Sequence, residues 1–139
     1  MVKNSILDII YNNLVSQVFI FQKEIKEQRE KNNFFFINDN WILGYISGFC
    51  QTLFQAQPIP ILNFQELVLS TLVETKFIEK NDNDLQFLHT TLNKLTKENS
   101  DPSFVKGFKN GVDDVISIAK DKKYPKTLFE YLSNIFNKK

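Results

Sequence analysis

Apolar residues recur at alternating spacings of four and three along the N-terminal part of the chain, which is the period of one face of an α-helix. This apolar seam comprises Leu7, Tyr11, Leu14, Val18, Phe21 and Ile25. Beyond Ile25 the pattern becomes a ladder of lysines and glutamates that can pair one helical turn apart. The pattern predicts one long first helix that ends near Asn32 and Asn33.

The second predicted helix is apolar on nearly every side. It begins near Asn38 or Asp39, which are both good N-caps, and ends before Pro58. No lysine or arginine occurs between Lys31 and Lys76. A helix without a polar face is expected to be buried, so we predict that this is the central helix of the protein.

Start signals and apolar periodicity predict two more helices in the middle of the chain. Asn63 and Glu66 form a capping-box pattern that opens a third helix, which extends to about Phe77. A polar turn over residues 81–84 follows it. The amphipathic pattern of a fourth helix is then carried by Leu85, Leu88, Leu92 and Leu95.

Proline marks the start of each of the last two predicted helices. Asp101 can cap a fifth helix whose first position is Pro102 and whose end lies near Lys120. Tyr124-Pro125 opens a sixth helix. No Asp-Gly dipeptide occurs, and the Asn-Gly dipeptide at Asn110-Gly111 lies inside the predicted fifth helix and not between two strand-like runs. We therefore predict an all-α fold, a single-domain bundle of about six helices that spans residues 1–139.

The four glycines lie in two segments that align at an offset of 63 residues. Residues 41–49 and 104–112 share the frame aromatic, two residues, glycine, aromatic, two residues, glycine, apolar. This match suggests two copies of a three-helix unit. Small residues spaced by four let two helices approach closely, so we predict that the second and fifth helices cross at these glycines. The functional alternative is that the glycines line an open notch for a ligand.

Composition narrows the class of function. The chain has 139 residues, 42% of them hydrophobic, and a formal net charge of +1. Sixteen of its 17 basic residues are lysine, and the only arginine is Arg29. Readers of nucleic acid rely on arginine and on a basic surface, so we expect no nucleic-acid partner. The most hydrophobic segment, residues 41–54, is too short to span a membrane. With no secretion signal and a single cysteine, we expect a cytoplasmic protein without a membrane partner.

Cys50 and His89 are the only nucleophile and imidazole that the chain could pair for catalysis. Cys50 lies in the most apolar helix, where cysteine usually behaves as a small hydrophobic residue. His89 flanks the leucine seam of the fourth helix, a common place for a half-buried histidine. We therefore expect Cys50 to be structural, and we predict no catalytic residue and no enzymatic activity.

Acidic residues provide two weak candidates for a metal site. Asp82 and Asp84 resemble the start of a calcium loop, but Phe87 and Asn93 stand where that loop needs glycine and a carboxylate. A second candidate combines Asp113 and Asp114 with two glutamates at matching repeat positions, Glu66 and Glu130. No Glu-x-x-His pattern supports it, so we predict no metal and no cofactor.

Two surface features are candidates for partner binding. Lys120, Lys122, Lys123 and Lys126 form a basic cluster between the fifth and sixth helices. A helix C-terminus favours lysine without any partner, but the cluster also suits a phosphate or an acidic partner. The second feature is Phe34-Phe35-Phe36, which either plugs the end of the bundle or exposes a ring as an interface anchor.

The sequence favours a function in binding over a function in catalysis. We expect a protein-binding module, and within that class a bacterial toxin-neutralising inhibitor of the immunity type, or an adaptor. A small helical enzyme or a carrier of an apolar small molecule is the alternative. The residues that we assign to partner binding are Phe35, Asp113, Asp114, Lys122, Lys123 and Lys126.

Overall fold

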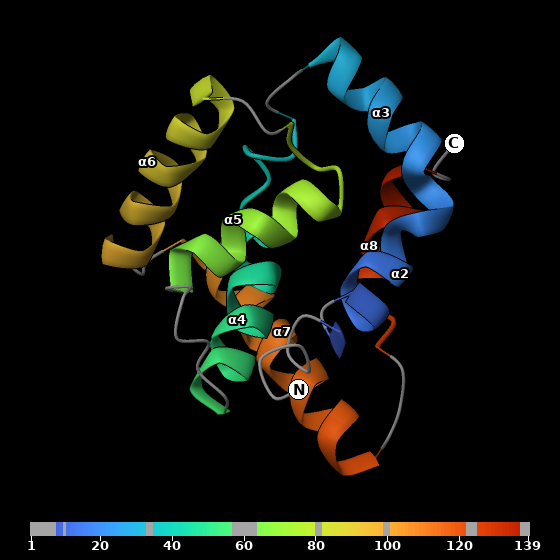
Figure 1. Cartoon of the computed structure of the whole chain (residues 1–139), viewed down its shortest axis with the longest axis vertical. Helices are drawn as coiled ribbons and strands as arrows, with labels where there is room; N and C mark the ends of the chain where they lie inside the picture. The colour runs from blue at the N-terminus through green and yellow to red at the C-terminus, as the bar shows by residue number, and fades with distance from the viewer. Residues whose placement is uncertain are drawn as a thin grey trace.

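The computed structural model describes residues 8–9, 11–32, 35–56, 64–79, 82–98, 101–121 and 125–136 of the chain (Figure 1). In the described residues the helical segments are η1 (Tyr11–Val15), α2 (Ser16–Val18), η2 (Phe19–Phe21), α3 (Gln22–Lys31), α4 (Asn40–Ala56), α5 (Phe64–Glu74), α6 (Asp82–Glu98), α7 (Pro102–Asp121) and α8 (Thr127–Phe136). These residues contain no strand. The predicted all-α bundle of about six helices is confirmed, with η1 to α3 in the place of the first helix.

The first helix is not the continuous α-helix that its periodicity predicted. Between Tyr11 and Phe21 it consists of a π-helical turn, η1, then the short α2 and the 3₁₀ turn η2, and α3 follows. Side-chain amides compete for its backbone carbonyls: Asn13 donates to the Ile9 oxygen at 2.9 Å, and Gln17 donates to the Asn13 oxygen at 2.7 Å. The apolar seam still faces the core, because Leu14, Val18, Phe21 and Ile25 are buried.

Two aspartates begin the long helices α4 and α7, as predicted. The carboxylate of Asp39 accepts the backbone N–H of Ile42, and that of Asp101 accepts the backbone N–H of Phe104, both at 3.0 Å. Each side chain satisfies one of the N–H groups that the first turn of a helix leaves without a partner. Pro102 occupies the first position of α7, where its missing N–H costs nothing.

Helices α4 and α7 cross in contact at their glycines. A Cβ atom added to Gly44 or Gly48 would overlap the carbonyl oxygen of Phe104 or Phe108, respectively. Gly44 meets Phe104, and Gly48, one turn further along α4, meets Phe108, one turn further along α7. The two helices therefore run in the same direction. The predicted close crossing is confirmed. The alternative of an open glycine notch is wrong, because the backbone of the opposite helix fills the space.

The same contact repeats with the two helices exchanged. A Cβ atom on Gly107 or Gly111 would overlap the carbonyl oxygen of Trp41 or Tyr45, which are the positions that the offset of 63 residues makes equivalent to Phe104 and Phe108. The flanking helices are exchanged in the same way: α5 packs against α6, and α8 packs against α2 (Figure 1). A duplicated three-helix unit with a pseudo-twofold axis between α4 and α7 would have this arrangement.

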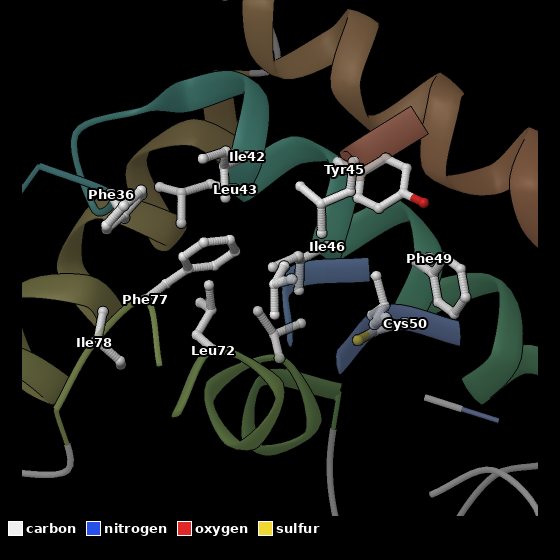
Figure 2. Close-up of a cluster of buried hydrophobic side chains, with 14 of the residues drawn as sticks. Phe36, Ile42, Leu43, Tyr45, Ile46, Phe49, Cys50, Leu72, Phe77 and Ile78 are labelled. Carbon is white, nitrogen blue, oxygen red and sulfur yellow. The ribbon is translucent and has the colours of Figure 1, made fainter. Parts of the chain in front are cut away.

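Helix α4 is the buried centre of the molecule, as its apolar sequence predicted. All residues from 41 to 50 are buried. Figure 2 shows Ile42 and Leu43 facing Phe36 and Phe77, and Cys50 at the far end of the same cluster. Most of this helix's surface therefore packs against other helices and the connection before it.

The predicted ends of two helices require correction. Helix α5 ends at Glu74 and not at Phe77, because Lys76 adopts a left-handed conformation with a φ of 71°. The resulting turn directs Phe77 and Ile78 into the core (Figure 2). Helix α6 begins at Asp82, inside the predicted polar turn. The capping box at Asn63 lies outside the described residues, as does Tyr124 of the predicted Tyr124-Pro125 start, and α8 begins at Thr127, two residues after Pro125.

Candidate functional site

The structure describes four of the six residues that we assigned to partner binding, namely Phe35, Asp113, Asp114 and Lys126. Phe35 is half-buried, and its ring stands edge-on to Phe36 with 4.9 Å between centroids. Phe36 and Ile37 are completely buried, so the phenylalanine run packs at least in part as a plug. Lys126 is exposed next to the start of α8. Lys122 and Lys123 lie outside the described residues, as does Phe34.

Asp113 and Asp114 face different surroundings although they are adjacent on α7. Asp113 is exposed, whereas Asp114 accepts hydrogen bonds from the Tyr45 hydroxyl at 2.5 Å and the Thr127 hydroxyl at 3.1 Å. Within the described residues, no three His, Cys, Asp or Glu side chains come together in a way that could hold a metal ion. Asp114 therefore has a structural role, and the hypothesis of a carboxylate metal site has no support in these residues.

Cys50 is buried at the contact of α4 with α5, as predicted. Its sulfur lies 3.5 Å from the hydroxyl of Thr71, which itself donates to the Leu67 carbonyl at 2.8 Å. Burial raises the pKa of the Cys50 thiol to about 12, so the thiol stays protonated at neutral pH. The polar neighbour of the thiol is a threonine, and His89 is an exposed residue of α6. This arrangement does not assemble the Cys–His pair.

A chain of hydrogen bonds joins four helices around Tyr45. The backbone N–H of Phe129 donates to Gln17 Oε1 at 3.0 Å, and Gln17 Nε2 donates to the Tyr45 hydroxyl at 3.2 Å. Tyr45 in turn donates to Asp114, which also accepts from Thr127. We call these five residues the Gln17 network. It begins and ends in the first turn of α8 and passes through α2, α4 and α7.

The protonation state of Tyr45 suits its place in the Gln17 network. Burial raises the pKa of its hydroxyl far above the ordinary value, and the nearby charge of Asp114 and the hydrogen bond to it raise it further. Tyr45 therefore stays protonated and donates a hydrogen bond to Asp114. Figure 2 shows the hydroxyl directed away from Ile46 and Leu72. Sequence reasoning missed this network. The signal available was Gln17 beside the buried seam, because a buried amide needs hydrogen-bond partners.

A second polar contact fixes α8 to the start of α4. The Tyr131 hydroxyl lies 2.8 Å and 3.0 Å from the two carboxylate oxygens of Asp39. Burial raises the pKa of Tyr131, and the hydrogen bond to Asp39 and its charge act in the same direction. The Tyr131 ring stacks on Trp41 with 4.1 Å between centroids, and Trp41 stacks on Tyr45 at 5.2 Å.

Large apolar side chains are exposed where η2 meets α8. Phe19 is 67% exposed and Ile20 is 68% exposed, the highest values among the large apolar residues of the described chain. Phe129 of α8 is 38% exposed, and its ring packs on Phe21 with 5.4 Å between centroids. We call Phe19, Ile20 and Phe129 the Phe19 surface. Sequence reasoning missed it, although three successive apolar residues at 19–21 cannot all face the core from one helix.

Comparisons with protein-family models, with curated proteins and with solved structures give no match for this chain. In the described part of the chain, no helix combines the length and the apolar character needed to cross a membrane.

Proposed function

We propose that this protein acts by binding another protein and that the Phe19 surface is the main contact. The observation that carries the proposal is the exposure of two adjacent large apolar side chains, Phe19 and Ile20, at 67% and 68%. Exposed apolar residues are common singly, but two adjacent ones, on the turn whose Phe21 packs on the partly exposed Phe129 ring, are typical of interaction surfaces. Aromatic side chains are also enriched at the centres of protein interfaces.

The local backbone supports the same proposal. Phe19 and Ile20 lie in a 3₁₀ turn, and a π-helical turn precedes it by three residues. Such irregular turns are uncommon in helices and often occur at functional positions. Phe19 and Ile20 therefore lie in the part of the first helix that departs from regular α-helical geometry.

Within the class of binding proteins, we propose a toxin-neutralising inhibitor of the bacterial cytoplasm. An inhibitor gains affinity when its contact residues are held in place before binding. Phe129 meets this requirement, because its backbone N–H is fixed by Gln17 and its ring packs on Phe21. The free thiol of Cys50 fits a reducing compartment.

The test is affinity capture with three immobilised forms of the full-length protein. The wild type, the double variant Phe19→Ser/Ile20→Ser and the control Ile116→Ser are exposed to the same native lysate, and captured proteins are quantified by mass spectrometry. Ile116 is 43% exposed on α7, so its variant removes a comparable apolar group elsewhere. Circular dichroism and thermal melting establish that each variant is folded.

We expect one partner at near-stoichiometric yield with the wild type and the control, and at least a tenfold loss with the double variant. Loss of two central apolar contacts has an effect of this size at protein interfaces. Equal capture by the double variant would overturn the assignment of the surface. If the partner is a toxin, the wild type must suppress its toxicity in cells and the double variant must not.

A further inference from the structure

Helix α8 depends on other elements for its first turn. Lys126 occupies the N-cap position, because its carbonyl accepts the first helical N–H, from Glu130, at 2.8 Å. A lysine side chain has no acceptor with which to cap a helix. The acceptor comes instead from α2, where Gln17 Oε1 binds the N–H of Phe129, the third helical residue. The side chain of Thr127, the first helical residue, is bound by Asp114 of α7.

Helix α8 is also short. It has 10 residues, and isolated helices shorter than about 12–15 residues are marginal in water. Its stability must therefore come from docking, through the buried Leu128 and Leu132, the Phe129 and Phe136 rings on Phe21, and the polar bonds at its first turn. Undocking removes the cap and the apolar contacts at the same time, so a partly undocked α8 has little to stabilise it.

Helices α4 and α7 are held in a different way. Their backbones are in direct contact at all four glycines, and they have no comparable dependence on side-chain caps from other helices. Proteins open locally in cooperative units, and the units that open at least cost are those with few buried contacts and exposed ends. The α4–α7 pair therefore belongs to the most stable part of the molecule, and α8 to a less stable part.

We infer that α8 is a strap that opens and closes as a unit on the rest of the bundle, and that the Gln17 network is its latch. Opening separates Tyr131 from Trp41 and Phe136 from Phe21, and so uncovers an apolar face between the first helix and the start of α4. The inference does not rest on the proposed function. If that function holds as well, a partner that touches Phe129 stabilises the closed strap, because binding and closing are then linked.

Amide hydrogen exchange of the intact protein, followed by NMR, tests this inference. In the wild type we expect the amides of residues 131–136 to exchange at least tenfold faster than the slowest amides of α4 and α7, and with a weaker dependence on urea. Equal rates and equal urea dependence would overturn the inference, because α8 would then exchange only through global unfolding.

Variants of the latch distinguish opening of α8 from unfolding of the whole protein. Thr127→Val removes one bond of the latch at nearly constant shape, and Gln17→Met removes the acceptor of the Phe129 N–H at similar side-chain size. Both variants destabilise the closed state, so we expect α8 amides to exchange about fivefold faster, the effect of one lost hydrogen bond. Unchanged α8 exchange in both variants would remove the latch from the proposal and overturn it.

Cys50→Ala is the matched core variant, because Cys50 contacts Thr71 of α5 and belongs to no part of the latch. It destabilises the closed and open forms alike. We expect it to accelerate the slowest amides of α4 and α7 and to leave the α8 amides unchanged. Acceleration of both sets by the same factor would contradict an independently opening α8. None of these measurements needs a partner, so a failed strap and a failed binding surface are distinguishable.

Discussion

At the scale of single residues, Gly48 and Gly111 illustrate how the absence of a side chain determines helix packing. Glycine lowers the stability of a helix by about 1 kcal/mol relative to alanine, so four of them in two helices are costly. This cost is offset by close packing of the two backbones. Each glycine lies against a carbonyl oxygen of the opposite helix, and any Cβ atom there would overlap that oxygen. Helix propensity and packing therefore predict opposite signs for the same substitution.

We expect Gly48→Ala and Gly111→Ala each to destabilise the protein by about 1–3 kcal/mol, because the two backbones must separate to admit a methyl group. The measurement is the free energy of unfolding from urea titration followed by circular dichroism. Lys109→Ala is the control, since Lys109 is exposed on the same helix as Gly111, and it should change the stability by less than about 0.5 kcal/mol. Glycine variants that unfold at or above the wild-type midpoint would contradict the close crossing.

Cys50 illustrates burial of a reactive group at the same scale. With its pKa raised to about 12 and its side chain completely buried, the thiol has neither the charge nor the access that reagents need. We expect negligible labelling by a thiol reagent in the native protein at pH 8 and complete labelling in denaturant. Rapid native labelling with a midpoint below pH 8.5 would show that the thiol is accessible and reactive.

At the scale of secondary-structure elements, two aspartates act both as caps and as links between helices. Asp39 caps α4 and binds Tyr131 of α8, while Asp101 caps α7 and binds the Asn40 side chain of α4 at 2.9 Å. Each start signal that is visible in the sequence therefore also fixes one helix against another. The second role was not visible, because Tyr131 is 92 residues away from Asp39 in the chain.

We expect Asp39→Ala and Asp101→Ala each to lower the free energy of unfolding by about 2 kcal/mol, which is more than the loss of an N-cap alone. Each substitution also leaves a half-buried donor without its acceptor, the Tyr131 hydroxyl or the Asn40 side-chain amide. Asp113→Ala, at an exposed position of α7, serves as the control. Urea unfolding measures all three, and a loss of no more than about 1 kcal/mol in either cap variant would contradict the second role of that aspartate.

At the scale of the whole molecule, the free energy of unfolding depends on pH because folding raises the pKa of one thiol and two tyrosine hydroxyls. The pKa of Cys50 rises from 9.0 to about 12 on folding, so the unfolded chain releases this proton first as the pH rises. The stability that comes from the protonated thiol is complete below pH 9 and is lost progressively up to about pH 12. Tyr45 and Tyr131, whose pKa values are also raised by burial, act in the same direction above pH 10.

We therefore expect the wild type to lose stability above pH 9, with a slope from Cys50 that approaches about 1.4 kcal/mol per pH unit. The measurement is the free energy of unfolding from pH 7 to 11. Cys50→Ala should be less stable at pH 7 but should lose less stability as the pH rises. Parallel curves for wild type and variant over the whole range would contradict a buried, protonated thiol.

The sequence was sufficient for features that depend on neighbouring residues. The apolar seam of the first helix, the caps at Asp39 and Asp101, the buried α4 and the crossing at the glycines all follow from spacing and from the chemistry of single side chains. The same reasoning failed where a local pattern is ambiguous. Continuous periodicity predicted a regular first helix, but the Asn13 and Gln17 amides bind its backbone carbonyls.

Only the tertiary structure decided which distant polar groups meet. Gln17 and Phe129 are separated by 112 residues, and nothing in either segment indicates that the amide of one caps the helix of the other. The exposure of Phe19 and Ile20 was also decided only by the tertiary structure. A run of apolar residues predicts burial, but which of them stay exposed depends on where the neighbouring helix packs. The physical reason is that periodicity records which face of a helix is apolar, whereas the partner of that face is determined by how the helices pack.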